Sequence, residues 1–431
     1  MPSFSIRAFG CQMNQYDARR TSAHLESCGW TPSGDDEEAD AIILFTCNVR
    51  AKAADKLFSH LGRLRETFGD GPVVAVVGCV AAAEGENIFR RAPNVSIVLS
   101  SRQYHKLPEL LDAALHTRAP ALDIGTCGLE KFSALPAASR AAPVEFLQIQ
   151  EGCDQYCSYC CVPYTRGREE SRPAKDVLAE AENLAARGAV ELNLLGQNVN
   201  AYNGGMTLAA LVREVAKLPQ ILRLRYTTSY PSLMTDEMAA LHGAEPKLAP
   251  LLYLPMQSGS DRVLKNMNRK YTRAQYMDIV GKFRRANPQM RISSDFIVGF
   301  PGETDADFEE TLGAVREIGF IQSFSFKFSP REGTPAAGMD GQVPDEVKTE
   351  RIMRLQSLLR AGQDAFNRSC SRRRQEVLWT EISPSGELVG RNGYQQLCIA
   401  RPGGKAAELL GRMTSFTPES ASYANLRGRV K

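Results

Sequence analysis

The sequence predicts an α/β protein with an N-terminal parallel-sheet domain, a central incomplete (βα)6 TIM-like barrel and a small C-terminal β-barrel. Strand-like and helix-like segments alternate over most of the chain, a pattern typical of parallel sheets. Beyond residue 370 the pattern changes to short strand-like segments separated by turns, which favours a small β-barrel. The length of 431 residues fits about three domains of this kind.

Four strand-like runs in the first third of the chain predict the first sheet. They read FSIRAFG, AIILFT, VVAVVG and VSIVLS, and a helix-compatible stretch follows each one. The first three end at a cysteine, namely Cys11, Cys47 and Cys79. Ligands of parallel sheets bind beyond the carboxyl ends of the strands. Because three βα units bring a thiol to that edge, we predict a metal site with three thiolates and an open position; cysteines placed there by chance as core residues are the alternative.

The middle of the chain predicts the incomplete barrel. Residues 128–143 are rich in Ala, Ser and Pro and predict a linker. Six strand-like runs follow, with helical stretches between them: VEFLQIQ, VELNLLG, LRLRYTT, LLYLP, RISSDFIVG and SFSFKFS. Six units are too few for an eight-unit barrel, so we expect one open side that suits a large substrate. The predicted domains are 1–127, 144–369 and 370–431, with the linker 128–143 after the first.

A second cysteine triplet lies in the run EGCDQYCSYC, at Cys153, Cys157 and Cys160. A structural zinc site and an electron-carrying cubane each need four protein ligands, so three thiols leave one metal position open for chemistry. On a helix the same spacing would place the thiols on one face as core fillers, and zinc is a further alternative. Gly152 before the triplet and Pro163 after it favour a loop.

Composition indicates the cellular compartment and the kinds of binding partner to expect. No apolar run approaches the roughly 20 residues that span a bilayer, and MPSFSIRAFG has no export-signal pattern. We therefore expect a cytoplasmic protein with reduced cysteines and no membrane partner. Residues 370–431 hold ten Lys and Arg against five Asp and Glu, which predicts either a polyanion partner such as nucleic acid or a solvated surface.

The sequence shows no P-loop and no nucleophile–base pairing, and its five histidines lie outside every motif described above. This pattern counts weakly against hydrolase or kinase activity.

These motifs resemble the radical S-adenosylmethionine methylthiotransferase family. CDQYCSYC resembles the radical S-adenosylmethionine signature, and GCQMN, TCNVR and GCV resemble the family's N-terminal domain. The C-terminal strands are similar to the RNA-binding TRAM module. CVPYTRGREESRP, LLGQNVNAY, LPMQSGSDRVLKNMNRKYT, SSDFIVGFPGET and GTPAAGM resemble its branch of tRNA-2-methylthio-N6-dimethylallyladenosine synthases. Two residues depart from the family pattern: Cys161 stands where Val is usual, and Tyr230 where His is common.

The resemblance implies two [4Fe-4S] clusters and S-adenosyl-L-methionine as cofactors. Cys153, Cys157 and Cys160 would bind the cluster whose open iron holds S-adenosylmethionine and generates a 5′-deoxyadenosyl radical. Cys11, Cys47 and Cys79 would bind an auxiliary cluster that carries the sulfur. The radical would remove hydrogen from C2 of N6-dimethylallyladenosine next to the tRNA anticodon, and a methylthio group would replace it.

Positions beside the cysteine loop and at the strand exits predict a set of cofactor-binding residues, and the resemblance favours the same role for Gly299. They are Tyr159, Arg166, Gly196, Gln197, Ser294, Asp295 and Gly299. Gly196 and Gly299 read equally well as turn glycines, and Arg166, Arg168 and Arg172 as surface residues or ion pairs. In the last domain, Arg391, Tyr394 and Arg427 would face RNA, whereas Trp379 fits the barrel core better.

The implied partners are tRNA, an electron donor and a sulfur source, with the enzyme as a monomer. A sister activity on threonylcarbamoyladenosine, or on an aspartate of a ribosomal protein, is the nearest alternative. An alternative of a different functional class is an RNA-binding iron–sulfur protein or redox sensor without catalytic turnover. The open metal position predicted at each of the two sites argues against it.

Overall fold

Six parallel strands form the first sheet, in the order β2-β1-β3-β4-β5-β6. The computed structural model describes residues 1–48, 51–69, 71–136, 140–401 and 406–430. All four predicted strands are present, and two short edge strands join them. The strands are β1 (Ser3–Phe9), β2 (Thr31–Pro32), β3 (Ala41–Thr46), β4 (Val73–Gly78), β5 (Val95–Leu99) and β6 (Ala121–Asp123).

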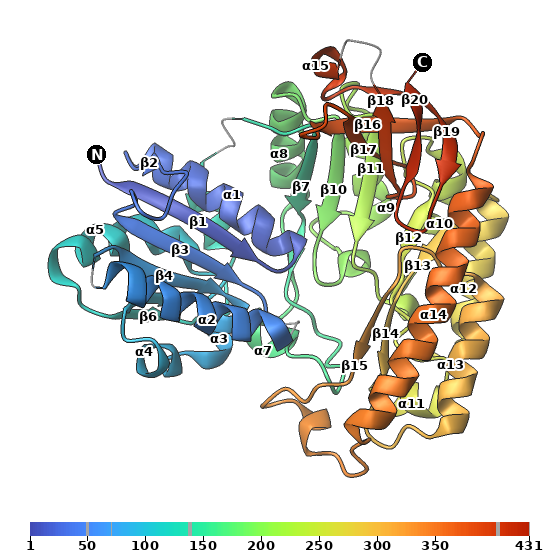
Figure 1. The fold of residues 1–431 in the computed structure, drawn as a ribbon, viewed down its shortest axis with the longest axis horizontal. Helices are drawn as coiled ribbons and strands as arrows, with labels where there is room; N and C mark the ends of the chain where they lie inside the picture. The colour runs from blue at the N-terminus through green and yellow to red at the C-terminus, as the bar shows by residue number, and fades with distance from the viewer. Residues whose placement is uncertain (49–50, 70, 137–139, 402–405, 431) are drawn as a thin grey trace.

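Helices cover both faces of this sheet (Figure 1). Along β3, Ile43 and Phe45 point to one face and pack with α1 and α5, while Ile42 and Leu44 point to the other and pack with α2 and α4. Burial on both faces explains why β3 and β4 read as continuous apolar runs. The helices are α1 (Gln12–Ser27), α2 (Ala51–Phe68), α3 (Cys79–Glu84), α4 (Asn87–Arg91), the short η1 (Tyr104–Lys106) and α5 (Leu107–Thr117).

The central strands follow one another in chain order, and all their pairings are parallel. β10 pairs with β7 and β11, and single bridges at Leu224–Leu248 and Gln257–Phe296 continue the series. Ser294 divides one predicted strand into β13, which pairs with β12, and β14, which pairs with β15. The strands are β7 (Val144–Gln148), β10 (Glu191–Leu195), β11 (Arg223–Thr227), β12 (Leu251–Tyr253), β13 (Arg291–Ser293), β14 (Asp295–Val298) and β15 (Phe324–Lys327).

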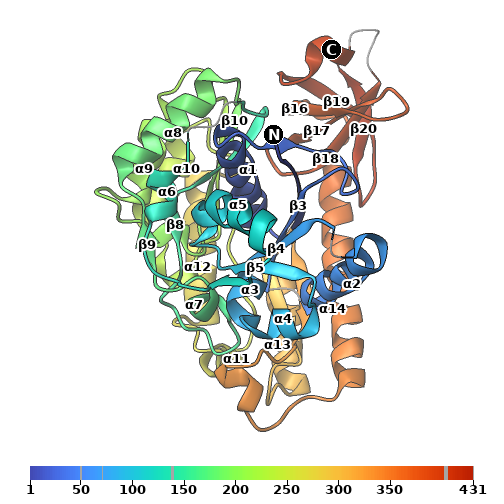
Figure 2. The ribbon, with the colours of Figure 1, turned by 90° about the vertical axis from the view of Figure 1, so that its left-hand side faces the viewer.

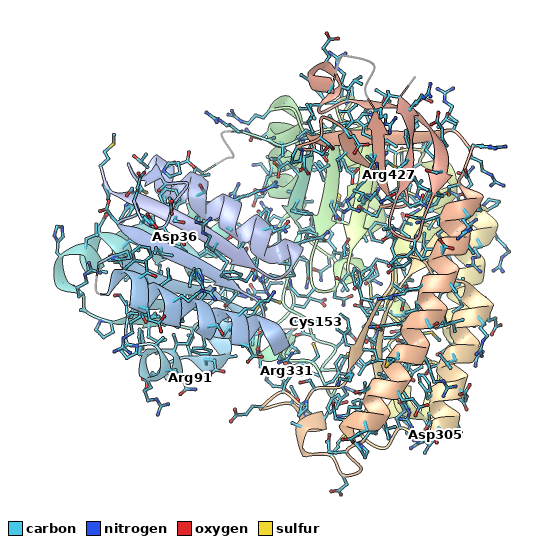
Figure 3. All side chains as sticks on the ribbon, in the orientation of Figure 1. Asp36, Arg91, Cys153, Asp305, Arg331 and Arg427 are labelled. Carbon is cyan, nitrogen blue, oxygen red and sulfur yellow. The ribbon has the colours of Figure 1, made fainter. Side chains whose placement is uncertain are left out.

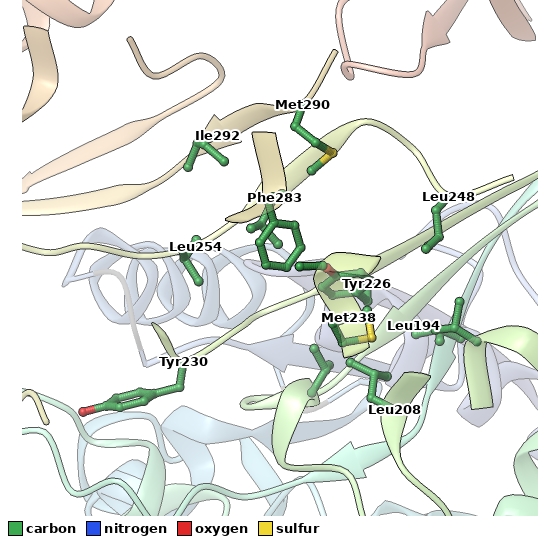
Figure 4. Packing of buried hydrophobic residues seen from close by; sticks show 14 of the residues in the cluster. Leu194, Leu208, Tyr226, Tyr230, Met238, Leu248, Leu254, Phe283, Met290 and Ile292 are labelled. Atoms are coloured by element: carbon green, nitrogen blue, oxygen red, sulfur yellow. The ribbon is translucent and has the colours of Figure 1, made fainter. Parts of the chain in front are cut away.

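A continuous core lies between these strands and their helices, and Figure 4 shows part of it around Tyr226 and Phe283. Thr272 and Thr304 each close the start of a helix with a capping box, which fixes where α12 and α13 begin. The larger helices are α8 (Ala174–Ala186), α9 (Leu208–Ala216), α10 (Asp236–Ala244), α11 (Asp261–Asn266), α12 (Arg273–Ala286), α13 (Asp305–Ile318) and α14 (Asp345–Ser369). No helix in the described ranges has the length and apolar character needed to span a membrane.

The segment predicted as a linker is packed over part of its length. Residues Glu130–Ala134 form the short helix α6, and the Lys131 side chain is fully buried. Composition suggested an unstructured connection, but tertiary ion pairs hold this turn against the sheets. Residues 137–139 of the predicted linker lie outside the described part of the chain, as do Val49 and Arg50 of the TCNVR motif.

Five strands close into a barrel at the end of the chain, in the order β16-β17-β18-β20-β19. Trp379 is fully buried in its core and meets Phe416 edge to face, so the expectation for Trp379 is confirmed. The barrel stands beyond α14 at one end of the molecule (Figure 2). Its elements are β16 (Gln375–Ile382), β17 (Leu388–Asn392), β18 (Leu397–Arg401), α15 (Ala406–Leu409), β19 (Met413–Ala421) and β20 (Leu426–Val430).

Two buried arginines of β11 attach the barrel to the central strands. Arg223 donates to the Arg391 carbonyl at 3.0 Å, and Arg225 donates to the Asn392 carbonyl at 2.8 Å. Both also pair with Glu191 of β10, which neutralises part of their charge. The barrel is therefore fixed relative to the central sheet by charge-assisted hydrogen bonds.

Candidate active site between the two sheets

Cys11, Cys47 and Cys79 lie at the carboxyl ends of β1, β3 and β4, which are neighbours in the sheet. Two glycines with positive φ let the chain turn sharply there. A Cβ on Gly10 (φ +136°) would lie 2.3 Å from the Cys47 Cβ, and one on Gly78 (φ +107°) would lie 2.7 Å from the Thr46 carbonyl oxygen. The prediction that one sheet edge gathers these thiols is confirmed.

The electrostatics of this N-terminal triplet differ from one thiol to the next. A hydrogen bond with Cys47 lowers the pKa of the Cys11 thiol to about 6, against the effect of burial and with help from Arg166. Burial raises the pKa of the Cys79 thiol, although the positive charge of Arg166 acts in the opposite direction. The Cys11 side of the site therefore already favours a thiolate, the form that binds metals.

The second triplet lies in an irregular loop, as predicted. Residues 152–160 form neither helix nor strand, so the thiols do not share a helix face. Gly152 (φ +81°) opens the loop where a Cβ would lie 1.9 Å from the Arg168 carbonyl oxygen. The Ser158 hydroxyl donates to the Asn266 carbonyl at 2.8 Å and fixes the middle of the loop. Burial raises the pKa of the Cys153 thiol to about 12.

Arg269 lies beside this loop and donates from Nη1 to the Cys157 sulfur at 3.4 Å. Its other nitrogens donate to the Pro255 carbonyl at 2.8 Å and to the Tyr271 hydroxyl at 3.0 Å. The guanidinium lies 4.3 Å from the ring centre of Tyr230. Tyr230, at a position where His is common in the family that the motifs resemble, therefore packs on the arginine that contacts the Cys153–Cys160 loop.

Arg166 lies beside the N-terminal triplet. It follows the Cys153–Cys160 loop in the chain, but its Nε donates to the Cys79 sulfur at 3.2 Å. Its other nitrogens pair with Glu151 at 2.9 Å and with Asp17 at 3.2 Å, and the residue is 2% exposed. The ion pairing that the sequence left open for Arg166 is present, and its guanidinium lies beside the N-terminal triplet because its buried carboxylate partners are on that side.

Cys161 also faces the N-terminal sheet. Its sulfur lies 3.8 Å from the Asn48 carbonyl oxygen, next to Cys47. Burial raises the pKa of the Cys161 thiol to about 11. The loop therefore presents Cys160 and Cys161 to different surroundings. Figure 3 shows Cys153 at the junction between the N-terminal sheet and the central strands.

A buried ion network lies behind the junction. Lys131 pairs with Glu151 at 2.6 Å and with Asp17 at 3.4 Å, and all three side chains are 1% exposed or less. Burial alone would raise the pKa of Glu151, but Lys131 and Arg166 hold it at about 2. Two cations and two carboxylates thus balance one another where the two sheets meet.

Gly196 and Gln197 lie at the exit of β10, beside the start of the Cys153–Cys160 loop. The Gln197 side-chain oxygen accepts from the Gly152 amide at 2.6 Å. A Cβ on Gly196 would lie 2.5 Å from the Gln150 side-chain oxygen, so glycine permits this close approach. Gln150 also accepts from the Gln197 amide and donates to the Gly152 carbonyl.

Several buried polar atoms at the carboxyl ends of the central strands have no hydrogen-bond partner within the described residues. They are Oε1 of Gln148, the last residue of β7, Gln197 Nε2 and Asn198 Oδ1 after β10, Ser229 Oγ after β11 and Gln257 Oε1 after β12. Buried polar groups in native proteins are almost always satisfied. Four strand exits therefore offer donors and acceptors to a polar ligand, whose identity they do not specify.

The other residues predicted to bind a cofactor are Asp295, Tyr159, Ser294 and Gly299. Asp295, on β14, accepts a hydrogen bond from the hydroxyl of Tyr253, on β12. Tyr159 is partly buried and packs against Val263 and Phe300. Ser294 is fully buried and uses its hydroxyl to accept from the Met256 amide at 2.8 Å. Gly299 (φ +69°) faces Lys348 of α14, whose Cγ a Cβ would approach to 2.3 Å. The geometry gives Ser294 and Gly299 roles in positioning the chain.

The remaining predicted side chains mostly have protein partners. Arg168 is exposed and pairs with Asp154, and the buried Arg172 pairs with Glu180 at 2.7 Å. Tyr394 packs on Phe366, and Arg427 pairs with Glu387 at 3.0 Å. Arg391 lines an open groove between β15, α14 and the barrel.

Sequence reasoning missed five residues of the site: Asp17, Lys131, Gln150, Glu151 and Arg269. Gln150 and Glu151 immediately precede the cysteine loop, and that position was an available signal. The other three lie far away in the chain, and only the fold brings them near.

No three Cys, His, Asp or Glu side chains of the described residues are grouped as ligands of one metal ion. A ligand role for the six cysteines is therefore a prediction from their spacing in the sequence.

Comparisons with known proteins identify the family. Residues 147–315 match the model described as Radical SAM superfamily, and residues 3–100 match that described as Uncharacterized protein family UPF0004. A relative from Erythrobacter litoralis, described as tRNA-2-methylthio-N(6)-dimethylallyladenosine synthase, is 49% identical over 91% of this chain and 90% of its own length. The chain belongs to this synthase family.

A second member of the synthase family, from Rickettsia felis, is 44% identical over 99% of this chain and 98% of its own length. Two solved structures share the fold. The radical S-adenosylmethionine methyltransferase TsrM from Kitasatospora setae gives a TM-score of 0.58 at 15% identity, over 78% of this chain and 77% of that one. The cobalamin-dependent S-adenosylmethionine radical enzyme OxsB gives 0.55 at 12% identity, over 83% and 56%.

Proposed function

We propose that this chain is a tRNA-modifying enzyme that converts N6-dimethylallyladenosine next to the anticodon into its 2-methylthio derivative. The single observation that carries the proposal is the contact between the segments that bear the two triplets: Arg166, which follows the Cys153–Cys160 loop, hydrogen-bonds the Cys79 sulfur, and the Cys161 sulfur lies 3.8 Å from the Asn48 carbonyl oxygen. C2 of adenine has neither an acidic proton nor a leaving group, so acid–base chemistry alone cannot functionalise it. One site that makes a radical and another that supplies sulfur meet this requirement.

Cys153, Cys157 and Cys160 would hold one [4Fe-4S] cluster, and Cys11, Cys47 and Cys79 a second. Three observations support the fit: the irregular loop of the first triplet, the strand-end placement of the second, and an arginine hydrogen bond to one sulfur of each. Cluster-bound S-adenosylmethionine supplies the radical chemistry when both are present.

The protein's own residues would bind and orient S-adenosylmethionine. The unpartnered atoms of Gln197, Asn198, Ser229 and Gln257 would hydrogen-bond S-adenosylmethionine beyond the strand ends, with Asp295 and Tyr159 nearby on the same domain. Gly196 keeps the β10 exit close to Gln150, which ties that exit to the cluster loop. The N-terminal triplet would hold the cluster that supplies sulfur, and Arg166 and the buried ion network fix the segments around it.

The domain boundaries we propose are 1–127, 144–369 and 370–431, with 128–143 between the first two. The central domain would be an incomplete barrel with β7 and β15 at its open edges, since the strands follow chain order from one to the other. The closed five-strand barrel would be a TRAM-like module. The enzyme would act as a cytoplasmic monomer that uses an electron donor and a sulfur source.

An aromatic and basic groove supports tRNA as the substrate. It has a volume of about 430 Å³ and runs between β15, α14 and the barrel. Phe324 and Tyr423, both in its wall, are 52% and 50% exposed, and Phe326 beside them is 38% exposed. Arg360 lies 5.8 Å from the Tyr423 ring centre. Exposed aromatic rings stack on unpaired bases, and arginines bind phosphates, so the groove suits a single-stranded RNA loop.

Nucleoside mass spectrometry of tRNA from a deletion strain tests the proposal. We expect 2-methylthio-N6-dimethylallyladenosine to disappear, N6-dimethylallyladenosine to accumulate, and the wild-type gene to restore the modification. Neither Cys→Ala triple variant should restore it. An unchanged level of the 2-methylthio nucleoside would contradict the proposal. Loss of a threonylcarbamoyl derivative, or of a modified ribosomal aspartate, would point to a sister activity.

A further inference from the structure

Each cysteine triplet receives a hydrogen bond from one arginine. Arg166 Nε lies 3.2 Å from the Cys79 sulfur, and Arg269 Nη1 lies 3.4 Å from the Cys157 sulfur. Cys79 is the first residue of α3, whereas Cys157 lies in the irregular loop of residues 152–160, and neither arginine lies on the element that carries its cysteine. The arginines therefore act on the two sites separately.

Arg166 is held in place on every side. Glu151, Asp17 and the Asn14 side-chain oxygen accept from its terminal nitrogens, which leaves Nε directed at Cys79. Together with Lys131, these carboxylates make a set with two positive and two negative charges. Removal of the Arg166 charge would leave this buried set with a net negative charge next to Cys79.

Arg269 has a different electrostatic setting. It contacts the Pro255 carbonyl, the Tyr271 hydroxyl and the face of Tyr230, all of which are neutral groups. No carboxylate in the described part of the chain forms an ion pair with it. Its positive charge beside Cys157 is therefore not cancelled by an ion-pair partner among the described residues.

We propose that Arg166 and Arg269 are positioning residues that set the reduction potentials of the two clusters independently. The inference rests on the proposed function, in which the six cysteines are cluster ligands. Hydrogen bonds to ligand sulfurs and nearby positive charge stabilise the reduced, more negative form of a cluster, which raises its potential. The cluster held by Cys79 would depend on Arg166, and the cluster held by Cys157 would depend on Arg269.

Redox titration followed by electron paramagnetic resonance, on anaerobically reconstituted full-length protein, tests this inference. The Cys153/Cys157/Cys160→Ala triple reports the N-terminal cluster alone, and the Cys11/Cys47/Cys79→Ala triple reports the other. In each background, Arg166→Gln and Arg269→Gln are compared with Arg168→Gln. Arg168 is 81% exposed and pairs with Asp154 on the surface, so it is a matched control from the same loop.

We expect each arginine variant to shift the reduction potential of one cluster only. Arg166→Gln lowers the equilibrium constant for reduction of the N-terminal cluster about tenfold, which is about 59 mV for a one-electron couple, and leaves the other cluster unchanged. Arg269→Gln does the reverse, and Arg168→Gln shifts neither. Equal shifts of both clusters in both variants, or no shift in either, would overturn the inference.

Two further measurements keep the test decisive. If Arg166→Gln does not fold, Arg166→Lys keeps a charge but loses the Nε hydrogen bond; we expect a smaller shift in the same direction, and an unchanged potential would contradict the assignment. Iron and sulfide content separates this inference from the proposed function. Triples that retain the wild-type iron content would refute the ligand assignment itself, whereas unaltered potentials in loaded protein would refute only the roles of the arginines.

Discussion

Lys131 and Glu151 form a completely buried ion pair, with 2.6 Å between Nζ and Oε2. Lys131 comes from the segment between the two sheets, and Glu151 directly precedes the Cys153–Cys160 loop. The pair therefore joins the connection between the sheets to the base of the cluster loop, and Asp17 and Arg166 extend it to the N-terminal triplet.

Lys131→Met should reduce the free energy of unfolding by about 3–5 kcal/mol, because it leaves two buried carboxylates with only Arg166 as a cation. Urea denaturation at pH 7 measures this loss. The matched control is Lys106→Met, which breaks the exposed pair with Asp123 and should cost at most about 1 kcal/mol. Equal costs for the two variants would contradict the structural role of the buried pair.

The same pair predicts that the stability of the fold depends on pH in the acidic range. The folded pKa of Glu151, about 2, lies below its usual value of 4.5, so its contribution to stability is complete above about pH 4.5 and is lost as pH falls toward 2. Glu151→Gln should remove this part of the pH dependence. A variant whose stability falls between pH 4.5 and 2 as steeply as that of the wild type would contradict the lowered pKa.

His242 predicts a second pH window. Burial lowers the pKa of His242 to about 4, and its ring contacts the Tyr226 hydroxyl at 2.8 Å. Because the unfolded chain binds the proton more tightly, this residue contributes stability above pH 6.5 that is lost as pH falls to about 4. We expect His242→Gln to reduce the loss of unfolding free energy over this range by about 3 kcal/mol. The exposed His116→Gln serves as the control and should leave the pH profile of the wild type intact.

Gly10→Ala should abolish the N-terminal metal site. The new Cβ would lie 2.3 Å from the Cys47 Cβ, and Gly10 has a φ of +136°, which disfavours any other residue. Iron content after anaerobic reconstitution should fall from two clusters to one. Gly34→Ala is the matched control, since no atom lies within 4 Å of the added Cβ. Full loading of the Gly10 variant would show that the thiols do not need the close approach seen here.

The aromatic groove predicts residues that bind tRNA. Phe324→Ala and Phe326→Ala should each weaken binding of an anticodon stem-loop by about 1–3 kcal/mol, because base stacking on an exposed ring contributes that much. Arg360→Gln should reduce the slope of log affinity against log salt by about one unit. Fluorescence anisotropy at several salt concentrations measures both effects. Met353→Ala, on an exposed position of α14, provides the control; a loss as large as that of the phenylalanine variants would argue against the groove.

Local patterns predicted much of the fold and of the site. Apolar runs gave the strands of both sheets, because parallel strands buried on two faces read that way. Cys11, Cys47 and Cys79 could be assigned to one edge because all strands of a parallel sheet point in the same direction. Glycine and proline around Cys153 predicted the loop, since both interrupt regular structure.

Tertiary contacts determined what the sequence could not predict. Arg166 lies near Cys160 in the chain, yet its guanidinium turns toward Cys79 because Asp17 and Glu151 lie there. Lys131 looked like part of a linker rich in Ala, Ser and Pro, and only the fold buries it between carboxylates. Neither direction of a side chain nor a partner more than a hundred residues away is encoded in local composition.

The central claim, that the two triplets hold two clusters, is tested most directly by iron and sulfide content. The comparison is between anaerobically reconstituted wild type and the Cys11/Cys47/Cys79→Ala and Cys153/Cys157/Cys160→Ala variants. Two clusters in the wild type and one in each variant are the predicted result. An iron and sulfide content that stays the same in either variant would contradict the account.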